Sequence, residues 1–88
     1  MLNVVFKSRF KKDLKKLKSA KRDEDELLAV IELLAKEQPL AERFHDHALS
    51  GNYANHRECH VRPDWLLVYQ IEGSELILVR TGSHSELF

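Results

Sequence analysis

The stretch from residue 59 to residue 69 constrains the fold more than any other part of the sequence. Within it, Pro63-Asp64 predicts a tight turn, because proline presets the backbone angle of the first turn position and aspartate tolerates the second. An extended run ends before this turn, and a nearly unbroken run of apolar and β-branched residues follows it. The stretch therefore predicts a β-hairpin with a solvated corner. The polar residues of that corner are His60, Arg62 and Asp64.

The rest of the chain predicts a small α+β fold. Residues 2–6 have the composition of a short strand. Apolar stripes with helical spacing follow, at residues 10–17 and 27–34. Three further strand signals lie at residues 56–61, 65–71 and 75–81. The order β-α-α-β-β-β predicts an antiparallel-rich sheet of about four strands, with the helical hairpin on one face and the other face free for a ligand.

The alternation of side chains along a strand assigns faces to the polar residues. One face of the predicted strand at residues 56–61 is titratable, since it carries His56, Glu58 and His60. In the last strand, the same alternation places Arg80 on the face of Leu76 and Leu78. Both strands are thus expected to present charged groups on a defined side of the sheet.

Length and composition limit the class of protein. With 88 residues, we expect a single domain spanning 1–88 with one modest core. The lone cysteine, Cys59, has no partner for an internal disulfide, which fits a reducing cytoplasm. No apolar run approaches membrane-spanning length, and no signal-peptide pattern opens the chain. We therefore expect a soluble cytoplasmic protein with no membrane partner.

The formal net charge is zero, yet the charges are segregated along the chain. Basic residues concentrate at 7–22, where Asp13 is the only acid, and an acidic run at 23–26 follows directly. Such a segment is either a solvated helix face or a surface that contacts nucleic-acid phosphates, and the sequence leaves both interpretations open. The lysines of the candidate contact surface are Lys11, Lys12, Lys15 and Lys16.

Histidine is frequent in this chain, with five residues. A histidine taken singly is most often a surface or hydrogen-bonded residue, but its pKa near neutrality also allows it to accept and donate a proton. Three histidines come from separate segments that a compact sheet can bring together with Asp64. These candidate catalytic residues are His47, His60 and His84.

Metal binding, nucleophilic catalysis and base stacking are alternative roles for residues in this part of the sequence. The candidate metal pairs are His45 with His47 and Cys59 with His60. Neither pair has the usual spacing of a zinc site, so we expect no metal. Alternation turns Cys59 away from His60, which argues against a cysteine nucleophile. The aromatic residues that either fill the core or stack on nucleobases are Trp65 and Phe88.

Two segments carry a family resemblance: residues 60–69, His-Val-Arg-Pro-Asp-Trp-Leu-Leu-Val-Tyr, and residues 80–88, Arg-Thr-Gly-Ser-His-Ser-Glu-Leu-Phe. They resemble the YafQ branch of the RelE-like toxins, and residues 46–51 are similar to the histidine loop of that branch. The likeness covers essentially the whole chain, including the helix order and the basic first helix. Members of this family are ribosome-dependent mRNA endonucleases of bacterial type II toxin–antitoxin systems, held inactive by an antitoxin.

The resemblance implies a set of site residues: His47, His60, Asp64, Trp65, His84 and Phe88. It implies RNA cleavage without metal or cofactor, in which the 2′-hydroxyl attacks the adjacent phosphorus. Under this hypothesis His84 is the general acid. Asp64, together with His60, is the general base or orients the general base. The sequence does not decide which group is the acid and which is the base. The residues expected to bind phosphate or bases are His47, His60, Arg80, Trp65 and Phe88.

Two other classes of function stay open. ParE-like toxins use the same scaffold to inhibit DNA gyrase without cutting RNA, and a non-catalytic nucleic-acid or protein-binding module would use the basic helix as its contact surface. The partners implied by the resemblance are the bacterial ribosome with its rRNA and mRNA, and a DinJ- or RelB-like antitoxin. The antitoxin is expected at an exposed sheet edge or in a groove beside the helices. Operator DNA is expected to be contacted only through the antitoxin.

Overall fold

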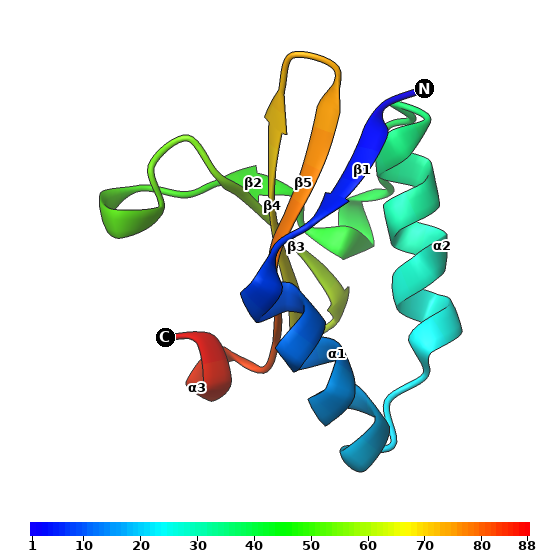
Figure 1. The fold of residues 1–88 in the computed structure, drawn as a ribbon, viewed down its shortest axis with the longest axis vertical. Coiled ribbons are helices and arrows are strands. Elements are labelled where there is room, and N and C mark those ends of the chain that lie inside the picture. The colour runs from blue at the N-terminus through cyan, green and yellow to red at the C-terminus, as the bar shows by residue number, and fades with distance from the viewer.

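The computed structural model describes the backbone of residues 1–88 and every side chain except that of Lys18. A five-stranded sheet forms its centre, in the order β1-β5-β4-β3-β2 (Figure 1). β1 runs parallel to β5, and the other neighbouring strands are antiparallel. The strand bounds are β1 Asn3–Phe6, β2 His47–Ala48, β3 Arg57–Arg62, β4 Trp65–Glu72 and β5 Glu75–Gly82.

Helices α1 (Ser8–Ser19) and α2 (Glu24–Ala35) pack on one face of this sheet. The main core joins apolar residues of both helices to inward side chains of β3, β4 and β5, such as Leu67 and Leu78. α2 begins after Asp23, whose carboxylate accepts a hydrogen bond from the backbone N–H of Asp25, as expected for an acidic helix start. The predicted α+β class, element order and helical hairpin are confirmed. No helix in the described part of the chain has the length and apolarity that crossing a membrane requires.

Two elements go beyond the sequence-based prediction. β2 lies inside the segment 39–55, which the sequence indicates as irregular; it contains two residues and forms only by pairing with β3. The second addition is α3 (His84–Leu87), a single turn that follows β5. Leu87 of α3 packs with Leu66 and Val68 on the face of the sheet opposite α1 and α2. Part of the face predicted to be free is therefore covered by α3.

A β-bulge in β5 places Arg80 on a different face of the sheet from the one that the sequence predicts. In the pairing of β4 with β5, Val68 lies opposite Arg80 but Tyr69 lies opposite Leu78, so Val79 is an extra residue. The bulge breaks the period-two alternation and moves Arg80 to the face of Val68, away from the face of Leu78. From this position the guanidinium of Arg80 pairs with Asp13 of α1.

Candidate active site

An open cavity of about 430 Å³ lies on the face of the sheet opposite α1 and α2. Its lining residues are His45, His47, Leu49, Glu58, His60, His84 and Phe88. The three histidines predicted as catalytic thus reach one cavity from β2, β3 and α3, and Phe88 lines it as well. The fold thus brings together histidines that lie up to 37 positions apart in the sequence, from His47 to His84.

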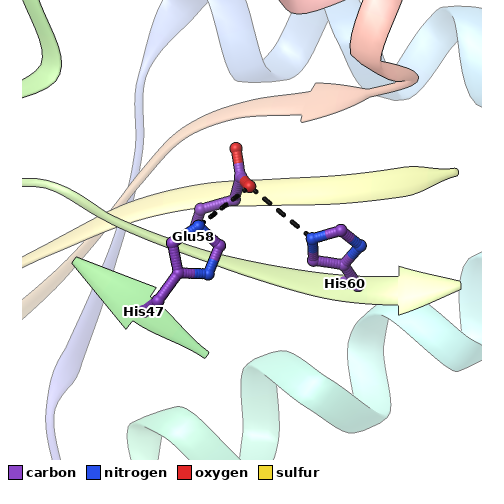
Figure 2. A group of neighbouring side chains, drawn as sticks. All are labelled: His47, Glu58 and His60. Atoms are coloured by element: carbon purple, nitrogen blue, oxygen red, sulfur yellow. Dashed lines mark ion pairs between the residues drawn. The ribbon is translucent and has the colours of Figure 1, made fainter. Parts of the chain in front are cut away.

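Glu58 lies between two of the histidines that line this cavity. Its side chain is buried, and its Oε1 atom lies 3.3 Å from Nε2 of His47 and 3.7 Å from Nε2 of His60. The strands fix this arrangement: His47 of β2 lies directly opposite Glu58 of β3, and His60 follows two residues later on the same face. Figure 2 shows both imidazole rings directed at the carboxylate from either side.

The backbone sets the tautomer of both imidazoles. Nδ1 of His47 lies 2.7 Å from the carbonyl oxygen of His45, and Nδ1 of His60 lies 3.2 Å from that of Pro63. Because a carbonyl oxygen only accepts, each Nδ1 carries the hydrogen and donates it. Both Nε2 atoms therefore face Glu58, ready to donate a proton to it when an imidazole is protonated.

His84, the first residue of α3, and Phe88, which directly follows α3, also line the cavity. Their rings are 5.6 Å apart, and Phe88 also contacts the ring of Tyr53 edge-on at 5.6 Å. The backbone N–H of His84 lies 3.4 Å from Oδ1 of Asp64, so the corner of the β3–β4 hairpin meets the start of α3. The carboxylate of Asp64, an exposed residue, thus faces the main chain of His84.

A capping box holds α3 in place. Oγ of Ser83 accepts a hydrogen bond from the backbone N–H of Glu86, and the Glu86 carboxylate accepts one from the Ser83 N–H at 2.6 Å. This backbone hydrogen bond is the main cause that lowers the pKa of Glu86 to about 2, and Arg22 contributes. The carboxylate therefore stabilises the folded state above pH 4.5, and this contribution is lost as the pH falls towards 2.

Removal of this cap is expected to loosen α3. We expect Ser83→Ala to lower the free energy of unfolding by about 1 kcal/mol, because the N-cap acceptor is lost.

Between pH 4.5 and 2, the unfolding free energy of the wild type is expected to fall more steeply than that of Glu86→Gln. Urea denaturation at a series of pH values measures the effects of both substitutions. Parallel pH profiles for the wild type and Glu86→Gln would refute the predicted role of the Glu86 carboxylate.

A second network fixes the loop that carries His47. The hydroxyl of Tyr69 donates to Oδ1 of Asp46 at 2.6 Å, and Nε of Arg57 donates to the same oxygen at 3.3 Å. Burial, with the hydrogen bond to Asp46, raises the pKa of the Tyr69 hydroxyl above its ordinary value, so it remains a donor. Asp46 lies between His45, which has a left-handed backbone with φ of 48°, and His47. The network therefore anchors β2 against the sheet.

We expect Tyr69→Phe to lower the free energy of unfolding by about 1 kcal/mol, because Asp46 loses its shortest hydrogen bond. The same substitution is expected to shift the imidazole ¹H–¹⁵N signals of His47 while leaving those of His84 in place. Asp46→Asn keeps an acceptor oxygen for Tyr69 and is the milder control. Unchanged His47 signals in Tyr69→Phe would show that the network does not position this ring.

Two interpretations of single residues require correction, and one candidate metal pair is excluded. Trp65 is buried in the core, where its indole N–H donates to Oγ1 of Thr81, so its ring has no face available for a nucleobase. Arg80 is buried too, and its guanidinium pairs with Asp13 of α1, so its charge is already balanced. Cys59 lies in the core on the opposite side from His60, which rules out a shared metal ion.

Burial also raises the pKa of the Cys59 thiol to about 12, which agrees with the expectation that this cysteine is not a nucleophile. The four lysines of the candidate contact surface are exposed on α1 and do not line the cavity. They remain an exposed surface that a polyanion can meet.

The sequence-based prediction left Glu58 out of the site. The signal was present, because alternation already placed Glu58 on the face of His60. What the sequence did not provide was β2, whose pairing brings His47 opposite Glu58 and closes the cluster. Potential metal-binding atoms of three described residues lie within 4.8 Å of one another. These residues are His47, Glu58 and His60.

Comparisons with known proteins agree with this geometry. The family model described as "Bacterial toxin of type II toxin-antitoxin system, YafQ" matches residues 2–88. The mRNA interferase toxin YafQ of Escherichia coli strain K12 is 32% identical over 87 residues, which cover 98% of this chain and 95% of that protein.

Solved structures show the same fold. A copper-bound mutant toxin from Helicobacter pylori is 49% identical, with a TM-score of 0.95 and full coverage of both chains. YafQ in the Escherichia coli DinJ–YafQ complex is 31% identical, with a TM-score of 0.92 over 100% of this chain and 99% of that one. The fold and the histidine-lined cavity define a bacterial toxin of a type II toxin–antitoxin system. Within that class, the chain belongs to the YafQ family.

Proposed function

We propose that this chain is an mRNA interferase, an endoribonuclease that cuts mRNA in the A site of the ribosome. The observation that carries the proposal is the convergence of His47, His60 and His84 on one cavity together with Phe88. The name of the Escherichia coli relative supports the same activity and substrate. Imidazoles beside an aromatic ring supply what RNA cleavage requires: proton transfer, positive charge near a phosphate, and a surface on which a base stacks.

In this reaction the 2′-oxygen of the RNA bonds to the adjacent phosphorus, and the bond from phosphorus to the 5′-oxygen breaks. The products are a 2′,3′-cyclic phosphate and a 5′-hydroxyl. His84, at the exposed start of α3, donates the proton that the leaving 5′-oxygen needs. Asp64, next to the His84 backbone, accepts the 2′-hydroxyl proton or, with His60, orients the group that does. No step requires a metal ion.

When protonated, His47 and His60 supply positive charge near the phosphate, and Glu58 aligns both rings. Phe88, which is 56% exposed and contacts Tyr53 edge-on, offers the aromatic face that Trp65 does not. The copper-bound state of the similar Helicobacter pylori toxin supports metal binding by this chain as a property separate from the cleavage step.

The proposal includes the macromolecular partners. The exposed lysines of α1 contact ribosomal RNA phosphates, and the release of counterions from the RNA favours this binding. A DinJ-like antitoxin holds the toxin inactive, as the Escherichia coli DinJ–YafQ complex suggests. The surfaces available to it are the free edge of β1 and a groove of about 460 Å³ between α2 and β3, lined by Val30, Phe44 and Val61 among others.

Primer extension on a defined message in a purified translation system tests the proposal. We expect cuts in register with codons when ribosomes are present and none when they are absent. A variant with glutamine at Lys11, Lys12, Lys15 and Lys16 is expected to cut the same positions at lower rate, with a shallower salt dependence. Cuts without ribosomes, or no cuts by a folded wild-type protein, would contradict the proposal and favour gyrase inhibition or a binding module.

A further inference from the structure

We propose that Phe6 stacks on an unpaired nucleobase of ribosomal RNA and thereby helps the toxin to bind the ribosome. The proposal deepens the function proposed above, because it rests on the ribosome as the partner. Phe6 is the last residue of β1, the strand at one edge of the sheet, and it is 43% exposed. It does not line the histidine cavity, so it would add a second contact with RNA.

The ring of Phe6 is held in place before any RNA arrives. It lies parallel to the ring of Phe10, with 5.8 Å between the centroids and 1° between the planes. Phe10 is fully buried in the core, so the inner ring of the stack is in the protein and the outer ring is at the surface. The Lys7 N–H donates to the Leu78 carbonyl and the Lys11 N–H to the Lys7 carbonyl, which fixes the junction of β1 and α1 (Figure 1). A ring that is already ordered loses little conformational entropy when a base binds.

Exposed basic residues follow Phe6 along the chain. A lone exposed phenylalanine is common on protein surfaces, so these charges are what indicate a partner. Six of them form the basic face: Lys7, Arg9, Lys11, Lys12, Lys15 and Lys16. In the part of the chain that the structure describes, none of these six residues forms an ion pair.

The charges of this basic face are not balanced within the protein. The only acid of α1, Asp13, is buried and bound to Arg80. Basic residues elsewhere in the chain differ, since five of them each pair with a carboxylate: Arg22, Lys36, Arg57, Arg62 and Arg80. Although the net charge of the chain is zero, the unbalanced charge of one face attracts a polyanion such as RNA.

The aromatic ring indicates which form of nucleic acid fits. Lys7, Lys11 and Lys15 recur every four residues, so they form a row along one side of α1 that begins directly after Phe6. Proteins that bind single-stranded nucleic acid combine basic residues, which follow the backbone, with aromatic rings that receive bases. A regular duplex keeps its bases stacked inside, so an unpaired base of a loop or bulge fits the ring better. An acidic protein can pair with the lysines but has no base to place on the ring, which is why we favour RNA.

Binding to purified ribosomes over a series of salt concentrations tests the proposal. Phe6→Leu keeps an apolar contact with Phe10 but removes the ring. We therefore expect binding to be at least about fivefold weaker, with an unchanged salt dependence because no charge is lost. Phe6→Trp keeps an aromatic face and is expected to bind about as tightly as the wild type. Leu28→Ala shortens an exposed apolar side chain on α2 and is the matched control, with unchanged binding. Wild-type affinity in Phe6→Leu, with its fold confirmed by circular dichroism, would overturn the proposal.

Cross-linking identifies the group that contacts the ring. Toxin with p-azidophenylalanine in place of Phe6 is bound to ribosomes and irradiated, and the cross-linked position is mapped. We expect a cross-link to an unpaired nucleotide of ribosomal RNA, whereas a cross-link to ribosomal protein alone would overturn the proposal. If the wild type does not bind ribosomes, the proposed function fails as well. If the wild type binds and cuts but Phe6→Leu binds equally well, only the stacking by Phe6 is wrong.

Discussion

Replacing His84 by alanine is expected to slow mRNA cleavage by about 10²–10⁴-fold, the usual contribution of a positioned general acid. His84 is the first residue of α3, is exposed, and lines the cavity opposite His47 and His60. No core contact is lost with this side chain, so stability should stay close to that of the wild type. Single-turnover cleavage on programmed ribosomes measures the rate, and urea denaturation measures the stability.

His56→Gln is the matched control for this experiment. His56 is also a partly exposed histidine that hydrogen-bonds a nearby carbonyl, that of Ala54, but it does not line the cavity. Its replacement should leave cleavage within a few-fold of the wild type. If His84→Ala also stayed within a few-fold, the assignment of the general acid would be wrong.

The largest effect on stability is expected from Asp13→Ala. Asp13 is 6% exposed at its side chain and accepts hydrogen bonds from both the guanidinium of Arg80 and the backbone N–H of Thr81. Its removal leaves a buried cation without a partner, which typically costs 3–5 kcal/mol. Because the Arg80 side chain keeps about a tenth of its surface in water, we expect a loss of about 3 kcal/mol in the free energy of unfolding. Urea denaturation measures this loss.

A double variant separates stability from function. Asp13→Leu combined with Arg80→Met replaces the ion pair by apolar side chains of similar size and is expected to recover most of the lost stability. If the double variant folds and cuts mRNA normally, Arg80 is structural; if it folds but does not cut, Arg80 also contacts the RNA. Arg62→Met, which breaks an exposed ion pair with Glu26, is the control and should change stability little.

Much of the fold follows from local signals that the sequence states directly. Helical spacing around Phe10 and Leu17 predicts the buried face of α1, and Pro63-Asp64 predicts the corner between β3 and β4. The position of Asp13 was a further signal, since it is the only acid in a basic helix and lies three residues after the buried Phe10. An isolated acid on a buried stripe indicates a buried cation, here Arg80.

The parts that the sequence did not reveal depend on tertiary pairing. β2 has no strand signal of its own, because two residues are too few to show alternation. The bulge at Val79 has no marker such as glycine, so alternation alone placed Arg80 on the wrong face. Trp65 follows the turn on the polar corner, but pairing of β4 with β5 directs its ring into the core. The site therefore required the fold before Glu58 could be recognised as its centre.

The central claim, that the RNA itself supplies the nucleophile at this histidine-lined cavity, is tested most directly by a single 2′-deoxy substitution. The mapped scissile nucleotide of the message is replaced by its 2′-deoxy form, and cleavage on the ribosome is measured for the wild-type toxin. We expect cleavage at that position to fall to background, while a 2′-deoxy nucleotide one position away leaves it unchanged. Cleavage of the substituted message at the original rate and position would contradict the mechanism, because no 2′-hydroxyl is then available to attack.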